Sequence, residues 1–144
     1  MKVVYHSGTG FRGTKRSQHH LQFSMYYLNR YAKDKYNKAD LEMGLIMNKK
    51  VMCIPDIILD DKHVVEVAIP FVNGMISGSS IMLTRYQKLF NLQLKEIFVP
   101  FLNEEPPEDC CEILTNKIVK RIERISIKDF ESLGILPPSK EFEI

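Results

Sequence analysis

The chain has 144 residues, of which 44% are hydrophobic and 26% are charged, a composition typical of one globular domain and not of a disordered segment. No apolar run approaches the roughly 20 residues that a membrane-spanning helix requires, and the first five residues lack the apolar stretch of a signal peptide. Three cysteines, two of them adjacent, have no metal-ligand spacing and argue against a disulfide-bonded secreted scaffold. We therefore expect a cytoplasmic protein of a reducing compartment, with no membrane partner.

Charge is distributed unevenly along the chain. The first 50 residues carry ten Lys and Arg against three acids, a net charge of +7, whereas residues 51–144 carry ten against fifteen, or −5. A basic N-terminal third suits nucleic acid, because phosphate contacts supply most of the sequence-independent affinity. A solvated, lysine-rich surface gives the same charge pattern, so charge alone leaves both interpretations open.

The N-terminal region predicts a loop and then a helix. Residues 5–16 contain three glycines, which let backbone N–H groups approach an anion closely, although their spacing matches no nucleotide-binding fingerprint. Ser17 can cap a helix that runs to about residue 35. The apolar stripe of this helix recurs at helical spacing and consists of Leu21, Met25, Leu28 and Ala32.

Three strands are expected next, at residues 41–47, 51–59 and 63–72, separated by turns at 48–50 and 60–62. Pro55 and Pro70 lie inside these runs, so each requires an edge, a bulge or a position without a ladder hydrogen bond. A Gly/Ser loop at 73–80 precedes a second helix at about 80–93, and residues 96–102 predict a fourth strand.

The C-terminal third is expected to be mainly helical. A helix is predicted from about residue 110 to 120, residues 122–127 fit either a helix or a strand, and residues 127–133 form a helical turn. Together the elements predict a single α/β domain over residues 1–144. It has a basic loop at 5–16, a core at about 17–102 with a central mixed sheet flanked by helices, and a helical extension at 103–144.

Asp56 and Glu66 are the acidic residues most expected to act together. If residues 60–62 form a three-residue turn, Leu59 pairs with His63, and Asp56 lies directly opposite Glu66, about 4.5–5.5 Å away. Ala68 follows two residues after Glu66 and points to the same face. A two-residue turn would make the contact between Asp56 and Glu66 diagonal. Carboxylates that converge in this way can hold the metal ions that hydrolyse phosphodiester bonds.

Glu66 is the only charged residue between Val64 and Val72. A buried, unpaired carboxylate is costly, so Glu66 should have a partner or a metal ion. The alternative is a structural salt bridge or a solvent-facing position at an edge of the sheet.

Pro55-Asp56, followed ten residues later by Glu66-Val67-Ala68, resembles the signature of the PD-(D/E)XK nucleases. The expected order of elements over residues 17–102 resembles their restriction-endonuclease-like αβββαβ core. The resemblance implies that Asp56, Glu66 and the carbonyl of Val67 bind Mg²⁺ or Mn²⁺. It also implies a metal-dependent endo- or exonuclease that hydrolyses phosphodiester bonds in DNA, favoured over RNA, and it allows a homodimer.

Further residues resemble the RecB-like, Holliday-junction-resolvase-like branch of this superfamily. That branch adds a histidine on the first helix, and His20, slightly preferred over His19, is the expected third contributor to the metal site. It also adds a catalytic Gln before an aromatic residue, which Gln87 and Phe90 match. Residues 17–33 contain no acid, so Glu42 is the best substitute for the first-motif metal ligand. The four-cysteine cluster of the branch is absent from the sequence.

Ala68 occupies the position of the catalytic lysine. In the nucleases that the chain resembles, this lysine orients or deprotonates the attacking water, whereas alanine has no proton to transfer. Either the natural chain has lost catalysis, or the alanine is an introduced substitution that disables it, which the intact surroundings favour.

The basic residues expected to contact nucleic-acid phosphates are Arg12, Lys15 and Arg16 near the N-terminus and Lys49 and Lys50 in a turn. Two other functions remain open. One is a non-catalytic nucleic-acid-binding module on the same fold, and the other is an assembly factor that uses the acidic segment from Glu104 to Glu112 against a basic partner.

Overall fold

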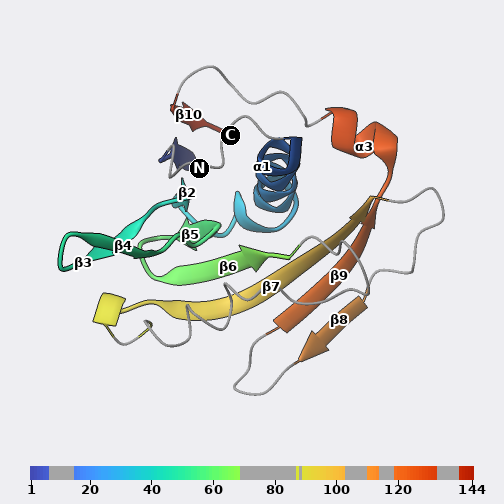
Figure 1. The fold of residues 1–144 in the computed structure, drawn as a ribbon. Helices are drawn as coiled ribbons and strands as arrows, with labels where there is room; N and C mark the ends of the chain where they lie inside the picture. The colour runs from blue at the N-terminus through green and yellow to red at the C-terminus, as the bar shows by residue number, and fades with distance from the viewer. Residues whose placement is uncertain (7–14, 69–86, 88, 103–109, 114–118, 133–139) are drawn as a thin grey trace.

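The structure is a computed structural model that describes residues 1–6, 15–68, 87, 89–102, 110–113, 119–132 and 140–144, with the side chains at 15–19 and 110–113 excepted. These residues form an α/β structure with one mixed sheet of eight strands and a separate two-stranded ribbon (Figure 1). Arg12, the strand expected at 69–72, the Gly/Ser loop and most of the helix expected at 80–93 lie outside the described residues.

The N-terminal unit is a helix between two parallel strands, β1 (Lys2–Tyr5) and β2 (Lys38–Leu41). The helix α1 (Lys15–Tyr27) continues into a π-helical segment, η1 (Leu28–Ala32), and together they confirm the helix expected at 17–35. All four residues of its predicted apolar stripe are buried. A parallel pair requires a crossover, which α1 and η1 supply.

A short antiparallel meander follows in the sheet. Strand β5 (Ile57–Leu59) pairs with β2 on one side and with β6 (His63–Val67) on the other. Asp60 and Asp61 have φ values of 48° and 59°, and the N–H of Lys62 donates to the carbonyl of Leu59 at 3.1 Å. Aspartate tolerates this left-handed backbone conformation. The turn leaves Leu59 opposite His63, which confirms the expected register.

The strands expected at 41–47 and 51–59 are each interrupted, so their predicted bounds were wrong. β2 ends at Leu41, and the next strands, β3 (Leu45–Met47) and β4 (Lys50–Cys53), pair only with each other. Pro55 separates β4 from β5, because proline has no N–H to continue a hydrogen-bonded ladder. We call Leu45–Cys53 the β3–β4 ribbon.

The second half of the sheet extends from β6 by parallel pairing. β7 (Gln93–Leu102), which includes the strand expected at 96–102, pairs with β6 and with β9 (Val119–Ile125). Strand β8 (Cys110–Ile113) lies antiparallel to β9, and β10 (Glu141–Glu143) lies antiparallel to β1. The order across the sheet is β10-β1-β2-β5-β6-β7-β9-β8.

The helical extension expected at 103–144 is therefore wrong for most of its described residues. Residues 110–113 form a strand and not the start of a helix, because pairing with β9 overrides the weak local preference of this segment. Residues 122–127, which fit either structure, fall mainly in β9. Only α3 (Ile127–Ser132) confirms the helical turn expected at 127–133.

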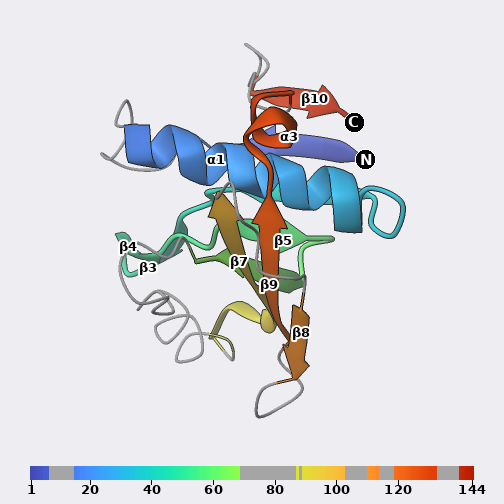
Figure 2. The same cartoon turned by 90° about the vertical axis from the view of Figure 1, so that its right-hand side faces the viewer.

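Alternate residues of the strands face two different environments. α1 packs across one face of the sheet (Figure 2), where Val65, Val67 and Phe98 join its apolar residues in the main core. Val64 and Glu66 therefore point to the opposite face. There, Val64 packs with Ile58, Leu94 and Leu45, so the base of the β3–β4 ribbon covers part of this second face.

A buried acid on β9 anchors the end of the helix to the sheet. Glu123 is 1% exposed and accepts a hydrogen bond from Tyr26 at 2.7 Å and another from Tyr31. Arg30 lies 3.1 Å from the same carboxylate. Burial and the hydrogen bond to Glu123 raise the pKa of Tyr31 to about 12, so its hydroxyl remains a donor at neutral pH.

We expect Glu123→Ala to destabilise the protein, because it leaves the two tyrosine hydroxyls without their acceptor. The free energy of unfolding should fall by roughly 2–4 kcal/mol in urea titrations followed by circular dichroism. Glu131→Ala on α3, at an exposed position, is the matched control and should change it by less than about 0.5 kcal/mol. Equal effects of the two substitutions would contradict an anchoring role for Glu123.

Candidate functional site

Strand register aligns three acidic residues across the sheet. Continuing the two registers of β5 by one residue places Asp56 between Glu42 and Glu66. The N–H of Glu42 donates to the carbonyl of Asp56 at 3.1 Å, and the N–H of Asp56 lies 3.4 Å from a carboxylate oxygen of Glu66. We call Glu42, Asp56 and Glu66 the carboxylate row. The expected position of Asp56 opposite Glu66 thus agrees with the observed register.

Asp56 is the electrostatically unusual member of the row. Its side chain is 13% exposed, and Oδ2 accepts the N–H of Val67 at 2.8 Å. Burial raises the pKa of Asp56 to about 7, and the charge of Glu42 adds to this increase, against the opposing effects of hydrogen bonds with Glu66 and Val67. Burial therefore favours the neutral form of Asp56, and a bound cation would favour its ionised form.

His20 projects from α1 to the same point. Its Nε2 donates to the carbonyl of Val67 at 2.8 Å, and its Nδ1 lies 3.4 Å from Oδ1 of Asp56. The hydrogen bond to the carbonyl places a proton on Nε2, so Nδ1 is protonated only in the charged form of the ring. The histidine thus touches two of the groups expected to bind metal. The side chain of His19 lies outside the described residues.

Glu42 has an unusual backbone conformation. Its φ is 52°, in the left-handed region that a residue with a long side chain rarely adopts, and the chain leaves β2 there to enter the β3–β4 ribbon. Such conformations cost on the order of 1–3 kcal/mol and concentrate at functional sites. The sequence offered Glu42 only as a substitute ligand, and the structure places it next to Asp56.

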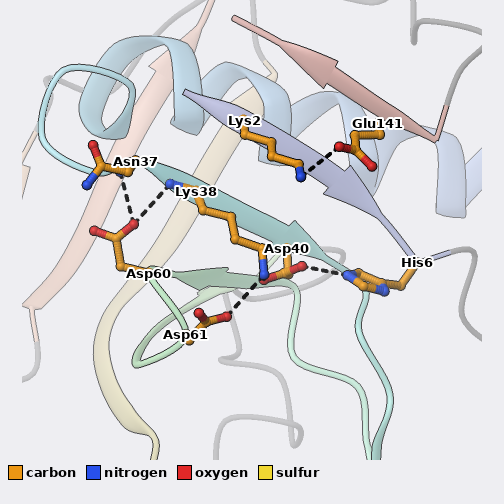
Figure 3. A network of polar contacts seen from close by, with 8 residues as sticks. All are labelled: Lys2, His6, Asn37, Lys38, Asp40, Asp60, Asp61 and Glu141. Atoms are coloured by element: carbon orange, nitrogen blue, oxygen red, sulfur yellow. Dashed lines mark hydrogen bonds and ion pairs between the residues drawn. The ribbon is translucent and has the colours of Figure 1, made fainter.

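A second buried acid beside the row is neutralised by its neighbours (Figure 3). Asp40 is 1% exposed, with Oδ1 2.6 Å from Nε2 of His6 and Oδ2 3.1 Å from Nζ of Lys38. Lys38 also lies 3.2 Å from Asp61, and its hydrogen bonds to both acids raise its pKa. The sequence did not single out His6 or Asp40, because nothing in the linear pattern shows that β1 and β2 are neighbours.

The same network fixes the turn between β5 and β6. Oδ1 of Asp60 accepts the backbone N–H groups of Asn37 and Lys38, each at 2.9 Å (Figure 3). The turn that sets the register of Asp56 and Glu66 is therefore tied to the beginning of β2 by three different side chains, those of Asp60, Asp61 and Lys38.

Ala68 continues β6 beyond Glu66. Its N–H donates to the carbonyl of Phe98 at 2.8 Å, and its side chain is buried with Ile97 and Val99. Because Glu66 pairs with Ile97, Ala68 lies on the Glu66 face, as expected.

The structure does not bring the other expected residues into the row. Gln87 is half-buried in a helical turn and, among the described residues, makes no side-chain hydrogen bond to Asp56 or Glu66. Lys49 and Lys50 are exposed at the turn of the β3–β4 ribbon. Lys15 and Arg16 begin α1, five and four residues before His20, and their side chains lie outside the described residues.

The donor set suits a hard divalent cation. Within the described parts of the chain, no three His, Cys, Asp or Glu side chains form a ready-made metal-ligand group. Mg²⁺ typically keeps several waters and uses only one or two protein carboxylates, so Asp56 and Glu66 meet its needs without a third side chain. Burial, which raises the pKa of Asp56, disfavours its charged form, and a bound divalent cation would offset that effect.

Comparison with protein-family models, curated proteins and solved structures found no match to this chain. Neither α1 nor α3, the helices in the described part of the chain, is long and apolar enough to cross a membrane.

The pKa of Asp56 predicts a pH-dependent change in stability. The folded-state pKa is about 7, above the unfolded value of about 3.9, so ionisation of Asp56 opposes folding. The effect is absent below about pH 4 and grows as the pH rises through about 7. Asp56→Asn cannot ionise and keeps an acceptor for Val67, so it should exceed the wild type in stability at about pH 8, by up to roughly 4 kcal/mol.

This gain should shrink by more than half at about pH 5, where Asp56 is protonated in the folded wild type. Denaturant unfolding at the two pH values measures it. Asp34→Asn, at an exposed acid, should show no comparable pH-dependent gain. A gain for Asp56→Asn that is the same at both pH values would contradict the raised pKa.

Proposed function

We propose that this protein is a divalent-metal-dependent nuclease of the PD-(D/E)XK type that acts on DNA and is disabled for hydrolysis by Ala68. The observation that carries the proposal is the carboxylate row, in which Asp56 and Glu66 lie opposite each other. His20 contacts both the carbonyl of Val67, which follows Glu66, and the carboxylate of Asp56. Burial also raises the pKa of Asp56, and a cation bound at the row would stabilise its ionised form.

The order of the elements supports the same proposal. α1 precedes β2, β5 and β6, which form an antiparallel meander, and β7 then lies parallel to β6 after a connection that contains helical residues 87, 89 and 90. This order is compatible with the αβββαβ core that the resemblance implies. The remaining strands, β1, β8, β9 and β10, extend that arrangement on both sides.

Each residue of the site has a role in this proposal. A divalent cation at the row, when bound, polarises the scissile phosphate and lowers the pKa of a water molecule. Asp56 and Glu66 hold the ion, and His20 orients the carbonyl of Val67. Ala68 offers neither a proton nor a charge to stabilise the developing negative charge on the phosphate, so hydrolysis is lost while binding remains.

The second candidate is a non-catalytic nucleic-acid-binding module on the same fold. It is favoured by the environment of Ala68, which is 1% exposed and packs with the apolar side chains of Ile97 and Val99. An alanine leaves no unsatisfied polar group there. The two candidates share the metal and DNA sites. They differ in whether a lysine at position 68 produces DNA cleavage.

Metal binding is the first test. We expect Mn²⁺ and Mg²⁺ to raise the thermal midpoint of the wild type at about pH 8, with a stabilisation near 2.7 kcal/mol at about 100 times the dissociation constant. Asp56→Asn and Glu66→Gln should each abolish the increase, whereas Glu131→Gln on α3 should retain it. An increase that survives both substitutions in the row would place the metal elsewhere.

Restoring the lysine is the second test. Ala68→Lys should produce metal-dependent DNA cleavage at least about 10²-fold above the wild type, because a charge positioned at the reacting phosphate is worth this much. Ala68→Met, which has a similar length and no charge, is the matched control and should remain inactive. A further Glu66→Ala substitution should abolish the activity.

The measurement is the conversion of labelled DNA and RNA, single- and double-stranded, with Mg²⁺ or Mn²⁺. Circular dichroism and thermal unfolding establish that each variant is folded. A folded lysine variant that binds metal and DNA but cuts none of these substrates would favour the non-catalytic binding module.

A further inference from the structure

The β3–β4 ribbon is inserted between two members of the carboxylate row. It begins three residues after Glu42 and ends three residues before Asp56. Figure 1 shows it outside the eight-stranded sheet, and Figure 2 shows it on the same side of the molecule as the beginning of α1. Whatever contacts the carboxylate row therefore comes close to the ribbon.

The base of the ribbon is held against the sheet. Leu45 is 7% exposed and packs with Ile58, Val64 and Leu94, and Cys53 packs against the same cluster. The register of the two strands shifts between Leu45 and Ile46, where the base meets the outer part of the ribbon. The base of the ribbon, at Leu45 and Cys53, is thus packed against the sheet, and the outer half from Ile46 to Val51 extends from it.

The outer half combines apolar and basic groups. Ile46 and Val51 face each other across the two strands and are 63% and 46% exposed. Asn48 and Lys49 form the tight turn, with φ values of 52° and 63°. Lys49 and Lys50 are exposed, and no acidic side chain of the described residues forms an ion pair with either.

We propose that the β3–β4 ribbon enters the major groove of double-stranded DNA, an inference that rests on the proposed nuclease function. The major groove of B-form DNA is wide enough for a two-stranded ribbon, whose strands lie about 4.8 Å apart. Ile46 and Val51 contact base edges, including the methyl group of thymine. Lys49 and Lys50 contact the phosphates that border the groove.

Two features favour DNA over another partner for this surface. The tip is positively charged, and the ribbon is continuous with a site suited to a metal ion and a phosphate. The groove also selects the type of duplex, because the major groove of double-stranded RNA is too deep and narrow for side chains to read.

The length of the β3–β4 ribbon limits the distance between its tip and the carboxylate row. The tip at Asn48 is six residues from Glu42, so it extends at most about 20 Å from the carboxylate row, at about 3.3 Å per residue. This distance corresponds to roughly six base pairs of DNA. The contacts made by Ile46 and Val51 therefore fall within about six base pairs of the phosphate at the row.

The experiment compares the binding of full-length variants to DNA in Mg²⁺. The apolar variant is Ile46→Thr with Val51→Thr, which preserves β-branching, and Ile127→Thr, at a position 43% exposed on α3, is its control. The basic variant is Lys49→Gln with Lys50→Gln, and Lys33→Gln with Lys35→Gln is its control. Fluorescence anisotropy measures binding to duplex DNA of about 20 base pairs, to one of its strands, and to duplex RNA, at several salt concentrations.

The apolar variant should bind duplex DNA about tenfold more weakly, with little change for the single strand or duplex RNA. The basic variant should reduce the slope of log affinity against log salt by about 2, since each lost phosphate contact contributes about 0.9. Both controls should bind as the wild type does.

Several results would overturn the inference. One is tight binding of the wild type to duplex DNA that neither ribbon variant weakens, and another is an equal loss on all three nucleic acids. A third is a wild type that self-associates through this surface, so that the apolar variant becomes monomeric without any change in DNA binding. The metal-binding test on Asp56 and Glu66 is independent of these measurements. A failure of the proposed ribbon–DNA contact can therefore be distinguished from a failure of the proposed metal site.

Discussion

The end of the hydrogen-bonded ladder at Pro55 is the constraint on which the site depends. Continuing the register of β5 and β6 puts Pro55 opposite Val67, and without an N–H Pro55 cannot donate to the carbonyl of Val67, which accepts from Nε2 of His20 at 2.8 Å instead. Since the pairing of β5 with β6 ends at Ile57, the N–H of Val67 takes a side-chain acceptor as well. The carboxylate of Asp56 supplies the partner at 2.8 Å. One oxygen of Asp56 is thereby fixed beside Glu66, and the chain before Pro55 is free to leave the sheet as the β3–β4 ribbon.

Two aspartates near this point lie on the same face of the sheet, two residues apart in register, in different surroundings. Asp40 has His6 and Lys38 beside its carboxylate. Asp56 lies between Glu42 and Glu66, with Nδ1 of His20 3.4 Å from its carboxylate, and burial raises its pKa. Neighbouring strands therefore give two acids of one face different electrostatic environments.

Local patterns in the sequence predicted the elements that depend on short-range pairing. The first helix followed from its apolar stripe, and the opposition of Asp56 and Glu66 followed from the length of the Asp60-Asp61-Lys62 turn. The interruption after Leu41 was missed because Glu42, Met43 and Gly44 do not mark a turn as clearly as proline does. Pairings between distant segments were also missed, including β8 with β9 and β1 with β2, since a strand at such a position is stabilised by neighbours that no local window contains.

The hydrogen bond between Glu42 and Asp56 closes the segment from 43 to 55 on itself, because the two residues that flank the ribbon are already neighbours in the sheet. A closed segment of this kind can lengthen, shorten or be exchanged at little entropic cost, since doubling a loop costs only about 0.6 kcal/mol. Glu42, Asp56 and Glu66 would keep their register while the length or sequence of the β3–β4 ribbon changed. The fold thus allows the ribbon to vary in length and sequence while the three acids beside it keep their places in the sheet.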